Sequence, residues 1–159
     1  MREKQAKPTF RDEVQLSLDA ASHIPAKLRG KIQHTLDDME APAFVRAVLG
    51  ALLYSTDPAR GFQSPASAFV LQHCLGNRES TWLSIQLIKR AIRELIETYR
   101  IPVGSSQGAA RGYYFILNAV MADTATRPIV AQIRGLLRHV TSLAPHAPAV
   151  KALTGKLEA

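Results

Sequence analysis

Residues 100–116 read RIPVGSSQGAARGYYFI, and this stretch decides the fold that we predict. Ile101 and Val103 lie on one side of a short extended segment, as in a β-strand. Residues 113–117 are rich in aromatic and branched side chains, which favour a second strand. Residues 104–112 between them are small or polar and are typical of a loop. The stretch therefore predicts a β-hairpin.

The predicted hairpin carries polar side chains that could contact a polyanion. Gly112 would let the chain turn back at positive φ, and Tyr113 and Phe115 would lie on the sheet face toward the core. Arg111 at the tip of the loop could enter a DNA minor groove or touch a phosphate. Three neutral phosphate donors would assist it: Ser105, Ser106 and Gln107. A solvated loop charge is the alternative for Arg111.

Two helices are predicted before the hairpin. The first would begin at Ser64-Pro65, a capping hydroxyl followed by a proline at the first helical position, and would end at Gly76. The second would run from Ser80 to about Tyr99, where Pro102 forces extended geometry. Its core stripe on a helical wheel comprises Ile85, Ile88, Ile92, Leu95, Ile96 and Tyr99.

An adjoining flank of the second helix is basic. It comprises Gln86, Lys89, Arg90 and Arg93, with Glu97 as its one acid. Such side chains could reach phosphates or base edges in a major groove, although a solvated surface is the alternative. Thr81 and Ser84 lie near the helix N-terminus, where free amides favour a phosphate. Leu83 and Leu87 fall outside the core stripe and would need cover from the N-terminal helices or a partner subunit.

Helix, turn, helix and hairpin in this order resemble a winged helix-turn-helix. The segments IPVGSS at 101–106 and GYYFI at 112–116 resemble the wing of biotin-repressor-like regulators and of small phage and prophage DNA-binding proteins. KRAIRELI at 89–96 resembles their recognition helix. The resemblance implies a mainly α fold with a two-stranded β-wing, an N-terminal helical extension and a C-terminal helix. It also implies duplex DNA as partner.

The N-terminal part of the chain predicts three more helices. One would run from Thr9 or Phe10 to about Ala21, and the next would follow Pro25. Their apolar positions are Phe10, Val14, Leu16 and Leu18 in the first, and Leu28, Ile32, Leu36 and Met39 in the second. Residues 43–55 are apolar on nearly every side and predict a central buried helix. We expect residues 1–40 to be an extension, 41–121 the winged core, and 122–159 a C-terminal helix and tail.

The C-terminal helix is predicted to open at residues 123–128 and to run to about Leu143. Its apolar residues recur at spacings of four, three, four and three, namely Ile129, Ile133, Leu136, Val140 and Leu143. This near-heptad pattern could form a homodimer seam or could pack on the same chain. The last dozen residues would be a loose tail or a short helix.

The charge of the chain favours a polyanionic partner. The net charge is +7, and residues 1–40 balance to zero, so the excess lies in the later segments. We find no apolar run of about 18 residues and no secretory signal, and therefore expect a cytoplasmic protein without membrane contact. The single Cys74 excludes an internal disulfide framework.

No motif for catalysis or for a metal or cofactor is recognisable. The histidines lack metal-ligand spacing, and residues 104–112 lack the Gly-Lys-Ser/Thr ending of a P-loop. Carboxylates are sparse after Glu97, and no nucleophile has a visible base. We expect a non-enzymatic regulator of transcription or of phage or plasmid replication. The alternative is a winged helix that binds proteins and not DNA.

Overall fold

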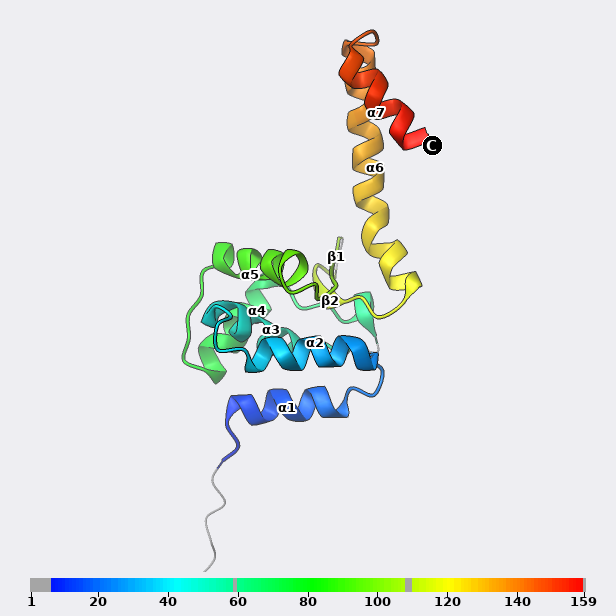
Figure 1. Ribbon diagram of the computed structural model, residues 1–159. Coiled ribbons are helices and arrows are strands. Elements are labelled where there is room, and N and C mark those ends of the chain that lie inside the picture. Colours follow the sequence, from blue (N-terminus) through cyan, green and yellow to red (C-terminus); the bar gives the residue numbers. More distant parts are fainter. Residues whose placement is uncertain (1–6, 59, 108–109, 159) are drawn as a thin grey trace, which may run out of the picture. The chain divides into compact units, whose positions relative to one another are not determined.

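The computed structural model describes residues 7–58, 60–107 and 110–158. In this part of the chain the fold is mainly helical, with seven α-helices, one 3-10 helix and a two-stranded antiparallel sheet (Figure 1). The prediction of a helix-rich fold with a small β-hairpin is therefore confirmed. The chain divides into two compact units, Met1–Ala122 and Asp123–Ala159, which we describe separately. None of the described helices is both long and apolar enough to cross a membrane.

Helix α3 (Ala43–Ser55) is the centre of the first unit. Helices α1 (Phe10–Ala20), α2 (Ala26–Asp37), α4 (Ala68–Arg78) and α5 (Ile85–Glu97) all pack against it. Val45, Val48 and Leu52 of α3 are completely buried, as the apolar run predicts. Side chains from residues 10–36 belong to the same hydrophobic core as those from the helices after residue 41.

For two residues of the N-terminal helices, the prediction of a core-facing apolar position is wrong. Leu16 is exposed because Phe10, Val14 and Leu18, spaced by four, define the buried face of α1, and Leu16 points away from it. Met39 is exposed because α2 ends at Asp37, so Met39 lies in the following turn and not on the helix. Thr9 caps α1 in a capping box with Asp12.

Helix α4 begins three residues later than predicted and ends two residues later. Ser67, not Ser64, is its N-cap and accepts a hydrogen bond from the amide of Val70 at 3.1 Å. Ala66 is held in extended geometry instead, because it exchanges two backbone hydrogen bonds with Tyr113, of 2.9 and 2.8 Å. The short 3-10 helix η1 (Gly61–Gln63) precedes this segment.

Helix α5 is also shorter than predicted. Its cap is Ser84, which accepts from the amide of Leu87 at 3.2 Å, whereas Ser80 lies in the turn with φ of 53°. Leu83 therefore precedes the helix, where the wheel does not apply, and it is buried in the core; Leu87 is partly buried against the same core. Ile96, predicted in the core stripe, is exposed.

The hairpin comprises β1 (Val103–Ser106) and β2 (Gly112–Phe115), paired from Val103 opposite Phe115 to Ser106 opposite Gly112. The first strand thus extends into the segment predicted as loop. Phe115 belongs to the core and Tyr113 packs against it, as predicted. Gly112 is required by close approach: a Cβ there would lie 2.5 Å from the carbonyl carbon of Ala66.

The second unit contains most of α6 (Ala119–Leu143), followed by α7 (Pro148–Glu158). Helix α6 begins before the predicted start, because Asn118 accepts from the amide of Met121 at 2.9 Å, and Pro128 lies inside the helix. Among the described side chains of residues 123–158, Val150 alone is buried.

Candidate nucleic-acid interface

A hollow of about 440 Å³ lies between the beginning of α4, the exposed side of α5 and the hairpin. Half of the predicted DNA-contacting residues line it, namely Lys89, Ser105, Ser106, Gln107 and Arg111. Its remaining wall is formed by Ser67, Ala68, Gly112 and Tyr113. None of the described residues that line it is acidic. We call this hollow the basic hollow.

The strand register explains why these residues meet. Ser105 and Ser106 end β1, and Arg111 immediately precedes β2, so their side chains lie at the same end of the hairpin. The bridge between Ala66 and Tyr113 then holds this end of the hairpin against the beginning of α4. The hydroxyl of Ser106 donates within the hairpin, to the carbonyl oxygen of Ala110. Ser105 is exposed and is the better placed donor to a ligand.

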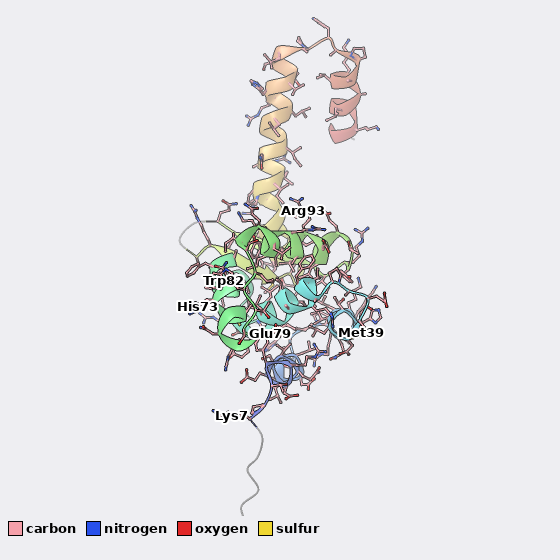
Figure 2. All side chains as sticks on the ribbon, turned by 90° about the vertical axis from the view of Figure 1, so that its left-hand side faces the viewer. Lys7, Met39, His73, Glu79, Trp82 and Arg93 are labelled. Carbon is pink, nitrogen blue, oxygen red and sulfur yellow. The ribbon has the colours of Figure 1, made fainter. Side chains whose placement is uncertain are left out.

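Helix α5 contributes a row of exposed polar side chains. Gln86, Lys89 and Arg93 follow one another at spacings of three and four and therefore share one face. Figure 2 labels Arg93 on α5. Across the part of the chain that the structure describes, no carboxylate lies within ion-pair distance of Lys89, Arg93 or Arg111. Their positive charges are thus uncompensated.

Arg90 is directed differently from the rest of the predicted basic flank. Its Nε lies 3.0 Å from a carboxylate oxygen of Glu94, one helical turn along α5. Its guanidinium carbon lies 5.7 Å from the ring centre of Phe44, at the beginning of α3. Arg90 therefore has an acid and an aromatic ring as partners and does not line the basic hollow. The spacing of four to Glu94 is a signal that sequence reasoning could have used.

Thr81 and Ser84, predicted near a phosphate at the N-terminus of the second helix, both make local hydrogen bonds. Thr81 lies in the turn before α5, where its hydroxyl donates to the carbonyl oxygen of Glu79 at 3.2 Å. Ser84 caps α5, so its side-chain oxygen is already an acceptor for a helix amide. Neither residue lines the basic hollow.

An exposed aromatic row on and beside α4 was not predicted. Phe69 is 68% exposed, and its ring stacks on His73 with centroids 6.4 Å apart. Trp82 is 70% exposed and lies over Gly76, where a Cβ would be 3.3 Å from the indole ring. His73 and Trp82 are both labelled in Figure 2. The sequence signal was the spacing of four between Phe69 and His73 on the predicted helix.

One group that lines the basic hollow has a shifted pKa. Burial raises the pKa of the Tyr113 phenol above its ordinary value, so this phenol is neutral near pH 7. It can therefore donate a hydrogen bond but adds no negative charge to the hollow. Among the described residues, no three histidine, cysteine, aspartate or glutamate side chains are grouped to hold a metal ion.

Comparisons with known proteins yield no relative. No protein-family model matches the chain, and no curated protein and no solved structure matches it. The function must therefore be inferred from the surface itself.

Proposed function

We propose that this chain is a non-enzymatic protein that binds duplex DNA through a winged helix-turn-helix. Its two helices would be α4 and α5, and its wing would be the hairpin. The observation that carries the proposal is the basic hollow, where Lys89 and Arg111 converge with exposed Ser105 and no lining acid. We place the role of the protein in control of transcription or of phage or plasmid replication, inside the cytoplasm.

The division of labour follows from the chemistry of each surface. Gln86, Lys89 and Arg93 on α5 have the reach and the hydrogen-bonding groups for phosphates and base edges of a major groove. Arg111 and Ser105 on the hairpin would contact the sugar-phosphate backbone and fix the register. Arg90 would contribute less, because Glu94 already compensates its charge.

Fluorescence anisotropy with a generic duplex at several salt concentrations tests the proposal. We expect wild-type affinity to fall steeply with salt, because each neutralised phosphate adds roughly 0.9 to the slope of log K against log salt. A K89A/R93A/R111A variant should lose at least about tenfold in affinity and roughly two to three units of slope. The single variant R90A should lose less DNA affinity than K89A, R93A or R111A does.

The control variant removes two positive charges from the second unit. K151A/K156A changes two exposed lysines that belong neither to the proposed DNA-contacting residues nor to the residues that line the groove between α6 and α7, so its affinity should stay within about twofold of wild type. The DNA proposal fails if the wild type does not bind at low salt, or if the triple variant and this control bind alike.

We also propose that α6 and α7 join a second copy of the chain. Ile129, Ile133, Leu136, Val140 and Leu143 share one exposed face of α6, and Arg127, Arg134 and Arg138 lie on the opposite side of the helix. Among the described residues, the side chains that line a groove of about 280 Å³ between α6 and α7 are all apolar. A helix pair with so little buried surface gains a core when a symmetric copy covers it.

Sedimentation equilibrium tests the homodimer. The wild type should be a dimer at micromolar concentration, and L136R should be a monomer because it brings two like charges to an apolar seam. R134L, on the opposite side of α6, is the matched control and should remain dimeric. A monomeric wild type would contradict the homodimer while leaving the DNA proposal intact.

The alternative function is a winged-helix module that binds a protein. Leu83 is buried and Leu87 is partly buried against the core, so these two leucines offer little surface for such a partner. The aromatic row of Phe69, His73 and Trp82 favours it instead, because large exposed aromatic rings are enriched at interfaces between proteins. A wild type that does not bind duplex DNA at low salt would favour this alternative.

A further inference from the structure

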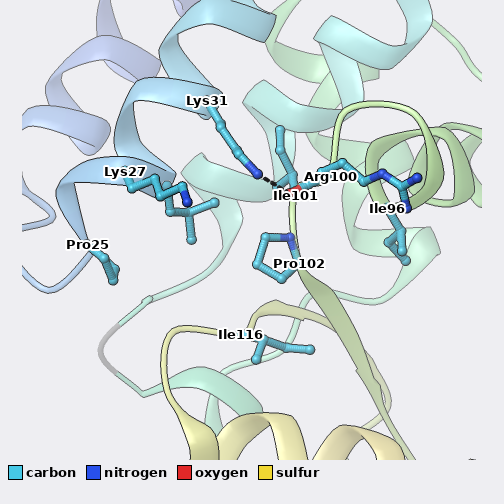
Figure 3. A pocket seen from close by; sticks show the side chains of 9 residues that line it. Pro25, Lys27, Lys31, Ile96, Arg100, Ile101, Pro102 and Ile116 are labelled. Carbon is cyan, nitrogen blue, oxygen red and sulfur yellow. Dashed lines mark hydrogen bonds between the residues drawn. The ribbon is translucent and has the colours of Figure 1, made fainter.

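A second hollow, of about 440 Å³, lies where α2 faces the connection between α5 and β1 (Figure 3). Leu28 and Ile101, both buried, form its floor. Its walls include Ile96, Pro102 and Ile116, and none of the described residues that line it is aromatic. Ile96 is an exposed residue that the helical wheel had placed in the core. This surface is aliphatic and open to water.

Three cationic residues surround the aliphatic floor. Lys27 and Lys31 stand one turn apart on α2, and Arg100 lies on the connection to β1 (Figure 3). The Lys31 ammonium donates to the carbonyl oxygen of Arg100 at 3.4 Å. In the part of the chain that the structure describes, no acidic residue lines the hollow or occupies the first turn of α2. Within the described chain, none of these three cations has an ion-pair partner.

We infer that this hollow binds an aliphatic monocarboxylate, a small anion with a hydrocarbon body. The hydrocarbon would cover Ile96, Ile101 and Ile116, which removes apolar surface from water. The carboxylate would remain beside Lys27 and Lys31, where its charge is compensated and need not be buried alone. The volume lies in the range of small-molecule sites in proteins.

The positive charges around the hollow favour an aliphatic carboxylate over an aliphatic amine or amide of the same length. An aliphatic amine of the same length would bring a fourth positive charge among three cations. An aliphatic amide would cover the same floor but would gain no charge-assisted hydrogen bond from the lysines. The hollow should therefore discriminate between ligands with the same hydrocarbon chain and different head groups, whereas a purely apolar surface would not.

This site shares no residue with the basic hollow, so it stands whether or not the chain binds DNA. Its wall is nevertheless the connection Arg100–Pro102, which joins α5 to the first strand of the hairpin. In the proposed DNA-binding protein, a ligand in this hollow would contact the connection between the recognition helix α5 and the wing. That consequence rests on the proposed function, whereas the binding itself does not.

Titration of the full-length, ¹⁵N-labelled chain with sodium octanoate, followed by NMR, tests the inference. The backbone amides of residues 27–31, 96, 100–101 and 116 should shift in a saturable manner, with Kd on the order of a millimolar or below for a ligand of this size. Octylamine at the same concentrations should shift none of them, and octanamide should bind at least fivefold more weakly. Equal shifts with octanoate and octylamine, or no shifts with octanoate, would overturn the inference.

Two variants locate the site. K27A/K31A removes two exposed cations and should raise the octanoate Kd at least fivefold, and I96E should do the same by placing a carboxylate at the wall. K151A/K156A removes the same charge elsewhere and should leave the Kd within twofold. The amide spectrum of each free variant reports directly that it is folded. An unchanged Kd in both K27A/K31A and I96E would exclude this hollow as the site.

Discussion

In residues 7–122, Val45, Leu52 and Leu95 are completely buried, whereas in residues 123–158 Leu136 and Leu143 are 58% and 73% exposed. Both regions are built from amphipathic helices with apolar residues at helical spacing. The difference lies in the number of elements that meet: four helices cover α3 in the first unit, but α6 and α7 form only a pair in the second. Periodicity thus indicates which side chains share a face, and the partner elements decide whether that face is covered.

Truncating a leucine in each unit should give the largest contrast. L52A should lower the free energy of unfolding by about 2–5 kcal/mol, because it leaves a cavity in a closed core. L136A should change it by less than about 0.5 kcal/mol at concentrations where the chain is monomeric, since Leu136 is 58% exposed and only lines the groove beside α7. Urea unfolding followed by circular dichroism measures both. Similar losses in the two variants would mean that the α6 face is covered within one chain.

Adding a methyl group to a glycine should give opposite signs in the two units. G112A should destabilise by about 1–3 kcal/mol, because its Cβ would meet the backbone of Ala66 at 2.5 Å. G135A, in α6 with no atom within 4 Å of the added Cβ, should stabilise by about 0.5–1 kcal/mol through helix propensity. Thermal unfolding of the two variants measures this, and a stabilising G112A would disprove the close approach that we describe.

A smaller destabilisation than in L52A is expected at the first helix of the first unit. T9A removes the N-cap of α1 and should cost about 1 kcal/mol. Hydrogen bonds from the side chain and the amide of Thr9 hold the pKa of Asp12 below its ordinary value. The contribution of Asp12 to stability is therefore present above the pKa of the unfolded chain, and it is lost as pH falls through the lower folded value.

Unfolding measured between pH 5 and pH 2 reveals this titration. The difference in stability between wild type and T9A should shrink as Asp12 is protonated. T141A, which removes a hydroxyl from the last turn of α6, is the control and should show no such convergence. A difference that stays constant down to pH 2 would contradict the role of the capping box.

The central helix and the hairpin could be predicted because their signals are local. The run of apolar residues at 43–55 and the aromatic strand before Ile116 specify burial without reference to the rest of the chain. The start of α4 could not be predicted, because Ser64 and Ser67 are both good caps. The choice between them is made by Ala66, whose backbone pairs with Tyr113 far along the chain.

The candidate site could likewise be predicted only where local sequence signals specify it. Lys89 and the hairpin residues Ser105 and Arg111 were predicted together and do line one hollow. The guanidinium of Arg90 lies near the ring of Phe44, and only the packing of α5 on α3 brings these two residues together. The aliphatic hollow depends on α2, whose lysines carry no motif. Periodicity and motifs therefore do not predict surfaces that are assembled from distant segments of the chain.

The pairing of Ala66 with Tyr113 also has a consequence for the order of folding. These two residues are separated by 47 positions, and two hydrogen bonds of 2.9 and 2.8 Å join them. Closing a loop of that length costs chain entropy that only the packing of α4 and α5 can offset. The hairpin should therefore dock late, and its amides should exchange with solvent sooner than those of α3. The surface proposed to meet DNA would be the last part of the first unit to form.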